Sequence, residues 1–351
     1  MKKYIIGICI VCAASFAFYA CNEEDFSSKE FYEYLVFLLS KEDNNVYNVL
    51  HPFVDDGDET IGYFSIGVGG SLPNPGAFTV ELEQNNTLFN RYNRLVFDVD
   101  SNRFARLLSP DKYHIDRMTV DFPANNRMKH VRVRVHVDNQ GLSPDSTYFI
   151  PLAIKSVTGG YQTNPEKVDM LYRIIVENYY AEQIRMTTYI DRGRKLEVRN
   201  PNAIDISEVI IVNDSLGQVS ETKAMKPLSK NSVRILAGEE KESRLGNPTV
   251  DELVQGAMIL TVLEDEYIDA PEGEYKNVSI KPYGTIQIEQ IDGEPFQPDG
   301  AKWNIYREEI ASMASDKKIK FFYLRYRYRT LIVDDYYTDW VYIQSVLRKQ
   351  E

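Results

Sequence analysis

Cysteine is almost absent from this chain. The 351 residues contain three cysteines, Cys9, Cys12 and Cys21, and none follows residue 21. Beyond that point the chain can form no internal disulfide, no thiolate metal site and no cysteine nucleophile. Any chemistry of the folded part must therefore rest on other side chains.

Basic charge is also in deficit. The chain has 40 lysine and arginine residues against 52 aspartate and glutamate residues, which gives a formal net charge of −12. Nucleic-acid binding depends on a surface that neutralises phosphates, so a chain this acidic is poorly suited to it. We expect no nucleic-acid partner.

The first 20 residues have the layout of a secretory signal peptide. Lys2 and Lys3 give a positive start, and the apolar run over residues 5–19 is too short for a membrane span. The junction that follows, with Ala20 before Cys21, resembles a bacterial lipobox. That resemblance implies that Cys21 carries a lipid at the start of the mature chain. The alternative is that Cys21 is one more apolar residue of the signal.

Acidic residues follow Cys21 at once, in a polar tether over residues 21–30. This run resembles the export signal of lipoproteins on the outer face of the Bacteroidetes outer membrane. The resemblance implies a protein that is held in the outer membrane by its lipid alone and faces the cell exterior.

The rest of the chain has the pattern of short β-strands separated by turns. With about 330 residues beyond the signal, it is long enough for two domains. In residues 131–137 four valines alternate with Arg132, Arg134 and His136, which is the period of a half-buried strand. No long helical pattern interrupts residues 31–180, and we predict a β-sandwich there.

Residues 181–351 favour strands as well, and we place the domain boundary near residue 180. A hairpin pattern closes the chain, with strands over residues 319–328 and 338–343 and a turn around Asp334 and Asp335. Two short helices are expected, one over residues 303–314 and one around Glu252. The pattern is compatible with an antiparallel β-barrel or with a second sandwich.

Four motifs of the first half resemble a known type of domain. They are RYN at 91–93, LLSPDKY at 107–113, GLSPDSTYFIPL at 141–152 and IIVENY at 174–179. Together they resemble the immunoglobulin-like N-terminal domain of Bacteroidetes surface lipoproteins, over residues 31–180. The remainder resembles the β-rich C-terminal domain that often follows, whose hallmark is a late pair of aromatic strands, here residues 321–328 and 340–343.

The resemblance also implies a setting. Such proteins are encoded in polysaccharide-utilisation systems beside a starch-utilisation-type outer-membrane receptor and transporter, which are the implied protein partners. Some relatives add a family 18 glycoside hydrolase domain, but this chain has neither the length for it nor its Asp-x-x-Asp-x-Asp-x-Glu run. No spacing places two carboxylates across a cleft. We expect no catalytic residues and no enzyme activity.

The four histidines are spread over the first half, at His51, His114, His130 and His136. His136 alternates with arginines on an outer strand face, and His51 precedes a proline. Surface or packing roles are therefore favoured over metal ligation, and we expect no metal site and no cofactor.

Aromatic residues are the best candidates for a binding site. Sugars pack their C–H faces on exposed tryptophan and tyrosine rings, while neighbouring polar groups bind their hydroxyls. Two groups in the second half fit this description: Trp303 with Tyr306, and Trp340 with Tyr336, Tyr337 and Asp339. The competing interpretation is that these rings are core residues, since Trp340 lies in an alternating strand.

The sequence favours a non-catalytic, lipid-anchored surface protein that binds a glycan, with the first domain as a spacer or docking module. The alternative is a structural or adhesin-like surface protein that docks a protein partner. An unrecognised hydrolase is a third possibility.

Overall fold

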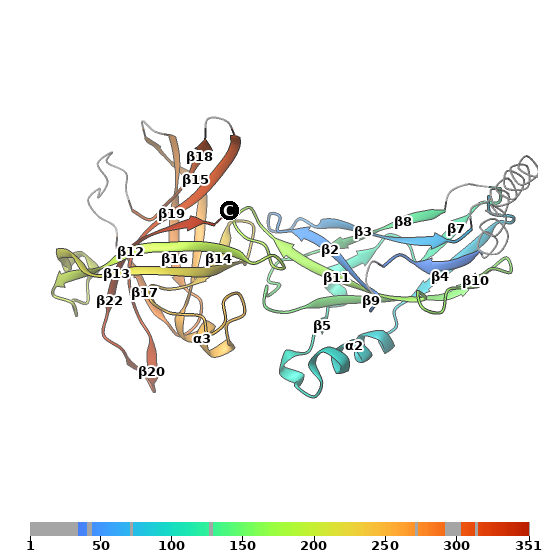
Figure 1. The fold of residues 1–351 in the computed structure, drawn as a ribbon, viewed down its shortest axis with the longest axis horizontal. Coiled ribbons are helices and arrows are strands. Elements are labelled where there is room, and N and C mark those ends of the chain that lie inside the picture. The colour runs from blue at the N-terminus through green and yellow to red at the C-terminus, as the bar shows by residue number, and fades with distance from the viewer. Residues whose placement is uncertain are drawn as a thin grey trace, which may run out of the picture. The chain divides into compact units, whose positions relative to one another are not determined.

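The structure is a computed structural model of the chain. It describes residues 34–40, 44–70, 73–125, 129–270, 273–291, 303–312 and 315–350. The predicted all-β, two-domain architecture is confirmed (Figure 1). Of the described residues, one compact unit holds those within 34–49, 61–136 and 148–173, and the other holds those within 50–60, 137–147 and 174–350. The predicted signal peptide, Cys21 and the tether over residues 21–30 lie outside the described residues.

The strands up to residue 177 form two sheets. One sheet has the order β10-β1-β3-β8-β6; the other has the order β2-β11-β9-β4-β7, with β5 paired to β9. Phe64 of β3 packs edge-to-face on Tyr172 of β11, with ring centroids 6.4 Å apart, so the sheets pack face to face. The strand bounds are β1 Leu35–Leu38, β2 Val46–Pro52, β3 Thr60–Val68, β4 Phe78–Glu83, β5 Arg106–Leu107, β6 Tyr113–Ile115, β7 Thr119–Phe122, β8 His130–Val137, β9 Tyr148–Val157, β10 Gln162–Thr163 and β11 Asp169–Glu177.

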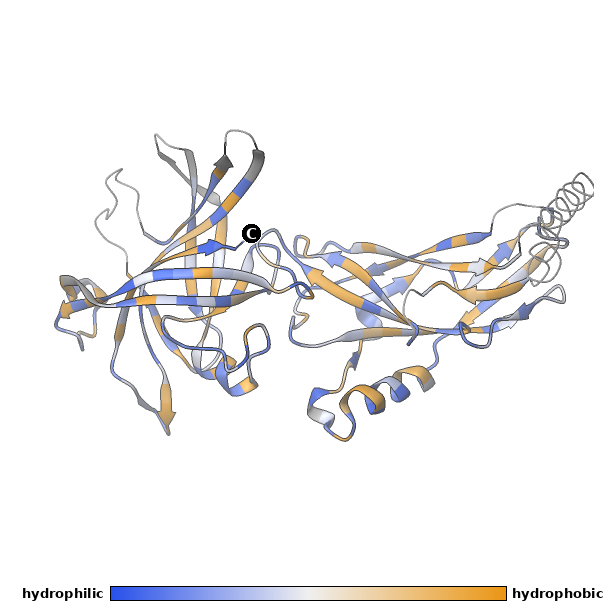
Figure 2. Cartoon of the chain, in the orientation of Figure 1, coloured by the Kyte–Doolittle hydropathy of each residue, from blue (hydrophilic) through white to orange (hydrophobic). Residues whose placement is uncertain are grey.

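Strand β8 shows why this sequence forms a sheet with one buried face. Its four valines are buried, while Arg132 and Arg134 between them are exposed. Hydrophobic and hydrophilic residues alternate along many of the strands (Figure 2). Successive side chains of a strand point to opposite faces, so this alternation fixes which face joins the core.

Helix α2 (Thr87–Phe97) was not expected from the sequence. Leu88 and Phe89 are buried, and the ring of Phe89 lies edge-to-face on Phe149, 6.3 Å away. The side chain of Asn93 accepts a hydrogen bond from the backbone N–H of Ala105 (2.9 Å) and donates to its carbonyl oxygen (3.2 Å). The sequence showed no long helical pattern in this half, but the apolar residues of this short segment follow a helical stripe.

Most of the strands from residue 187 onward form a closed barrel, the first of the two predicted arrangements, while β20 (Leu331–Val333) and β21 (Tyr336–Tyr337) form a separate two-stranded sheet. In the described part of the chain the order is β19-β18-β16-β15-β14-β13-β12-β22, and β22 pairs back with β19; β17 pairs with the far end of β19. The bounds are β12 Thr187–Arg199, β13 Ile210–Pro227, β14 Ser232–Leu236, β15 Ala257–Ala270, β16 Gly273–Pro282, β17 Gln287–Gln290, β18 Ile305–Ser312, β19 Ser315–Arg329, β20 Leu331–Val333, β21 Tyr336–Tyr337 and β22 Val341–Lys349.

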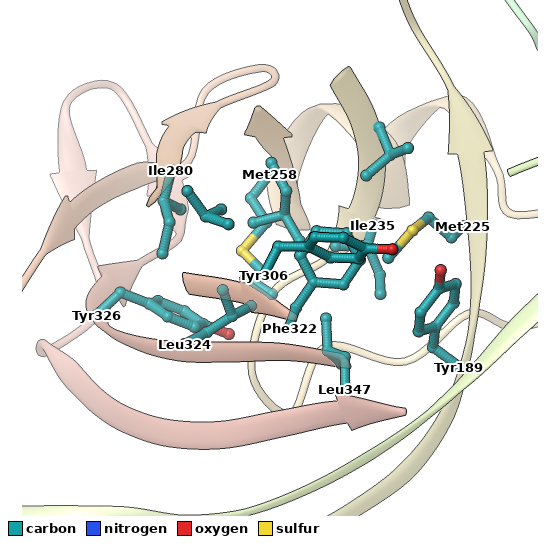
Figure 3. Close-up of a cluster of buried hydrophobic side chains, with 14 of the residues drawn as sticks. Tyr189, Met225, Ile235, Met258, Ile280, Tyr306, Phe322, Leu324, Tyr326 and Leu347 are labelled. Carbon is teal, nitrogen blue, oxygen red and sulfur yellow. The ribbon is translucent and has the colours of Figure 1, made fainter. Parts of the chain in front are cut away.

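Aromatic side chains fill much of the barrel. Tyr306 and Phe322 lie together among the aliphatic residues of this core, and Tyr189 lies near them (Figure 3). One ion pair is also enclosed: Lys223 Nζ lies 3.2 Å from Asp191 Oδ2, and both side chains are almost fully buried. Lys223 also donates to the carbonyl oxygen of Leu236 (2.9 Å), so the buried ammonium is hydrogen-bonded as well as paired.

The two helices predicted for the second half have different outcomes. Helix α3 (Val250–Gly256) confirms the one around Glu252, and it begins with a capping box between Thr249 and Glu252. The helix predicted over residues 303–314 is wrong, since β18 occupies residues 305–312. Asn304 precedes that strand with φ of 62° and accepts a hydrogen bond from the backbone N–H of Arg325, so sheet pairing overrides the local helix propensity. No described helix is long and apolar enough to cross a membrane.

Candidate functional site

Three neighbouring strands of the barrel, β18, β19 and β22, carry a polar pocket of about 930 Å³. All of its lining residues belong to the second unit. Each strand runs from a buried apolar residue to a charged residue two positions away: from Tyr306 to Glu308, from Phe322 to Lys320, and from Leu347 to Lys349. Residues two apart share a face of a strand. The charged side chains therefore sit where the inward face of the barrel leaves the core.

Glu308 is the centre of this pocket's hydrogen bonding. Its carboxylate accepts from the hydroxyl of Tyr306 (2.7 Å), from the hydroxyl of Tyr179, and from Lys318 Nζ (3.0 Å). Burial favours the neutral form of Glu308, but these three donors outweigh it and hold the pKa of the carboxyl below its ordinary value. Glu308 is therefore held as an anion.

Lys320 lies directly across from Glu308 in the ladder of β18 and β19. Its ammonium lies 3.4 Å from the ring centroid of Tyr179 and donates to the carbonyl oxygen of that residue. Burial and the nearby charge of Lys349 lower the pKa of Lys320 to about 8, against a smaller opposite effect of Glu308. The pocket thus holds two like charges close together.

Tyr179 is the exposed aromatic ring of the pocket. It is 58% exposed, and the ammonium of Lys320 lies over its ring. Burial and the hydrogen bond to Glu308 raise the pKa of Tyr179 to about 12, so the phenol stays protonated and remains a donor. A ring that is both exposed and tied at its hydroxyl is a preorganised surface for stacking.

The lining as a whole is more basic than the chain. Glutamates contribute four acidic side chains: Glu177, Glu182, Glu264 and Glu308. The basic side chains are six: Lys230, Lys276, Arg307, Lys318, Lys320 and Lys349. Since the whole chain carries a net charge of −12, this pocket is a local reversal of charge and suits an anionic or strongly polar ligand.

The structure separates the first predicted pair of aromatic residues. The ring of Tyr306 is 4% exposed and packs on Tyr180 and Phe322 in the core, with both centroids 5.0 Å away. Trp303 packs instead on another cluster, beside Tyr323. The two residues therefore do not form a joint sugar platform. Of this pair Tyr306 lines the pocket, where its hydroxyl bonds Glu308.

The second predicted group is only partly brought together. The guanidinium carbons of Arg327 and Arg329 lie 4.2 Å and 4.5 Å from the ring centroid of Trp340, and Arg329 also lies 4.9 Å from that of Tyr337. Two arginine side chains thus pack on the indole ring. This contact agrees with the competing interpretation, in which Trp340 is a packed residue. Tyr336 and Asp339 are exposed.

Sequence reasoning missed Tyr179, Glu308, Lys320 and Lys349. The signal that could have found Glu308 and Lys320 is the alternation of side chains with a period of two residues. Lys318, Lys320, Phe322, Leu324 and Tyr326 form one alternating series, and Tyr306 and Glu308 form another once residues 305–312 are taken as a strand. The register that brings these series together is not visible in the sequence.

Two family models match this sequence. A model of an N-terminal domain matches residues 29–160, and a model of a C-terminal domain matches residues 168–348. No curated protein matches the sequence.

Several solved structures from Bacteroides share the fold along most of their length. Two are Bacteroides ovatus proteins of unknown function, each 13% identical. One has a TM-score of 0.58 and covers 90% of this chain and 94% of its own. The other has a TM-score of 0.57 and covers 93% of each chain. An auxiliary nutrient binding protein from Bacteroides thetaiotaomicron is 12% identical, with a TM-score of 0.52 and coverage of 88% of this chain and 92% of its own. What this chain shares with them is the fold.

Proposed function

The chain belongs to the family that the C-terminal model over residues 168–348 describes, and from this premise we propose that it is a non-catalytic surface protein that binds a glycan. The fold that it shares with an auxiliary nutrient binding protein supports a binding role. The observation that carries the proposal is the pocket at Tyr179, Glu308 and Lys320.

The pocket offers what saccharide recognition needs. Tyr179 is exposed and Lys320 lies over one face of its ring, so the opposite face is the one offered to the C–H face of a sugar, and the polar groups around it can bond hydroxyls. The surplus of basic side chains favours sugars that carry carboxylate or sulfate groups over neutral sugars. The ligand class proposed is therefore an acidic polysaccharide.

The state of Glu308 supports binding rather than hydrolysis. A glycosidase needs a carboxylic acid whose pKa is raised, so that it can protonate the leaving group. The pKa of Glu308 is lowered instead, because Tyr179, Tyr306 and Lys318 donate to its carboxylate. It acts in this proposal as an orienting acceptor.

The proposal keeps the setting that the sequence implies. Cys21 carries a lipid that holds the chain in the outer membrane, facing the cell exterior, and residues 31–180 are an immunoglobulin-like spacer or docking module. The partners are an outer-membrane glycan receptor and transporter. Cys21→Ser should move the protein from the membrane fraction to the soluble fraction, and a variant that stays in the membrane fraction would contradict the lipid anchor.

Binding is tested by affinity electrophoresis of the chain from residue 22 onward against acidic and neutral polysaccharides. We expect retention by at least one acidic polymer. Tyr179→Ala should weaken it about 5- to 100-fold, the range expected for loss of one stacking ring. Tyr336→Ala removes a similarly exposed tyrosine outside the pocket, at 66% exposure, and should leave retention unchanged.

Three outcomes are informative. Retention that only Tyr179→Ala weakens supports the proposed site. Retention that Trp340→Ala abolishes instead would move the glycan site to the aromatic group first predicted from the sequence. No retention by any polymer would reject glycan binding, and a structural or adhesin-like protein that docks a protein partner would become the better account.

A further inference from the structure

Helix α2 packs on β9 (Figure 1), and the first unit covers only one of its faces. Leu88 and Phe89 are buried on the inner face. Arg91, Arg94 and Leu95 are exposed on the outer face, and Leu95 is 78% exposed. Residues three and four apart lie side by side on a helix, so these three side chains share one surface.

Exposed apolar side chains continue at the end of the helix. Val96 and Val99 are 50% and 87% exposed. Single exposed aliphatic residues are ordinary on a protein surface, but neighbouring ones indicate a contact with another molecule. Below, the α2 face means Arg91, Arg94, Leu95, Val96 and Val99.

Basic charge is concentrated around the α2 face. Within the described part of the chain, Arg91 and Arg94 form no ion pair with a carboxylate. The guanidinium carbon of Arg103 lies 5.8 Å from the ring centroid of Phe97, at the end of the helix. Residues 87–106 contain four arginines and two aspartates, in a chain whose net charge is −12. This segment therefore attracts anions although the chain as a whole repels them.

A hollow of about 450 Å³ lies on the same face, lined by Thr87, Asn90, Arg91, Arg94 and Leu95. Two arginines and a leucine thus border one space. Arginine binds phosphate through paired N–H groups, whereas a leucine side chain is stabilised by contact with apolar groups. A molecule that has a phosphate group beside apolar chains satisfies both, and a phospholipid is such a molecule.

The charge and the apolar residues together decide between the occupants. In a symmetric dimer the α2 face would meet its own copy, and arginines would repel arginines. An acidic polysaccharide would pair with the arginines but leave Leu95 and Val99 in water. Helices that lie on membranes combine arginines with exposed leucines, so an anionic lipid surface fits best.

We propose that the α2 face docks the first unit on an anionic phospholipid surface. The inference goes beyond glycan binding and rests neither on that proposal nor on a lipid at Cys21. It adds a second membrane contact where the sequence implied the lipid alone. A weak contact is sufficient in a chain that a lipid already tethers, because the tether makes the contact intramolecular.

The test is co-sedimentation of the chain from residue 22 onward, which has no Cys21 to carry a lipid, with phospholipid vesicles. One set contains phosphatidylcholine alone, and the other contains phosphatidylcholine and phosphatidylglycerol in equal parts. We expect binding to the anionic vesicles only, and less of it at high salt. The double variant Arg91→Gln, Arg94→Gln should bind about 30-fold more weakly, because each arginine near an anionic surface contributes about 1 kcal/mol. Leu95→Gln should lower the affinity about tenfold through the loss of apolar contact.

Two control variants are matched to these changes. Arg132→Gln with Arg134→Gln removes the same charge from exposed positions of β8, and Ile204→Gln removes an aliphatic side chain that is 98% exposed. Both should bind as the wild-type chain does. Thermal melting of every variant separates a loss of binding from a loss of folding.

Four results would overturn the proposal. A wild-type chain that binds no anionic vesicles would leave an acidic protein as the better occupant of the α2 face. Equal binding to phosphatidylcholine alone would remove the role of charge. An equal loss in either control would show that the vesicles report only overall charge or hydrophobicity. An unchanged affinity in Leu95→Gln would exclude the apolar contact.

Discussion

The buried histidine His51 should make the stability of the protein depend on pH in a predictable way. His51 is fully buried, and its Nδ1 lies 2.7 Å from Oγ1 of Thr60. Thr60 donates its own hydroxyl hydrogen to the carbonyl oxygen of Val137 (3.3 Å), so it can accept from an Nδ1–H group. The neutral ring therefore fits the site, and a charged ring would lose its hydration there.

Burial lowers the pKa of His51 from 6.5 to about 4. In the unfolded chain the ring keeps its ordinary pKa of 6.5. Between pH 6.5 and pH 4 the unfolded state therefore binds more protons than the folded state. The contribution of His51 to the free energy of unfolding is complete above pH 6.5 and falls as the pH falls through this window. A difference of about 2.5 pH units corresponds to about 3 kcal/mol, most of which is lost by pH 4.

The variant His51→Asn isolates this effect. The asparagine amide places an N–H near the position of Nδ1 but does not titrate. Carboxylates that titrate in the same pH range affect both proteins alike, so the difference between the two pH curves reports His51. Urea unfolding at pH 7, 6, 5 and 4 should show that the wild-type chain loses about 3 kcal/mol more than the variant over this range. Parallel pH curves, or a His51 signal, identified by its absence from the variant, that titrates near pH 6.5 in the folded chain, would refute the reasoning.

Three further substitutions probe the barrel. Asp191→Ala leaves the buried ammonium of Lys223 without its carboxylate and should lower the free energy of unfolding in urea by about 3–5 kcal/mol. A double variant that also carries Lys223→Met should recover most of that loss. An unchanged free energy of unfolding in Asp191→Ala would contradict the buried pair. Gly193→Ala would place a Cβ 2.3 Å from the carbonyl oxygen of Gln344. The substitution should therefore lower the free energy of unfolding by about 1–3 kcal/mol or more. An unchanged thermal midpoint would show that β12 and β22 do not approach so closely. Glu308→Gln removes a negative charge that raises the pKa of Lys320. An NMR titration of the variant should therefore place the pKa of Lys320 below the wild-type value of about 8. An unchanged pKa would mean that Glu308 does not act on Lys320.

The parts of the fold that the sequence predicted correctly are those decided by local pattern. The valines of β8 alternate strictly, and their burial follows from the two faces of a strand. Asp334 and Asp335 have positive φ values of 39° and 66°, which fits the turn predicted between the last long strands. The short helix around Glu252 begins with a capping box, which is a signal within four residues.

The predictions that failed depend on pairing between distant strands. Residues 303–314 include Arg307, Glu308 and Glu309, which are good helix formers, but β18 pairs with both β16 and β19. The same error hid the candidate site. In a helix Tyr306 and Glu308 would point in different directions, whereas in a strand they share one face. Their partner Lys320 is known only from the register of β18 with β19.

The barrel itself explains why the pocket is charged. A closed sheet fills its interior with apolar side chains only as far as the core extends, and beyond that point the same inward-facing positions meet water. On β19 this change falls between Phe322 and Lys320, and on β22 between Leu347 and Lys349. The ladder sets Phe321 opposite Arg348, so one step further along the same register sets Lys320 opposite Lys349. Two lysines that face each other repel, and an anionic ligand between them would relieve that repulsion. The repulsion is thus a physical reason in favour of the proposed acidic ligand, even though the chain as a whole is acidic.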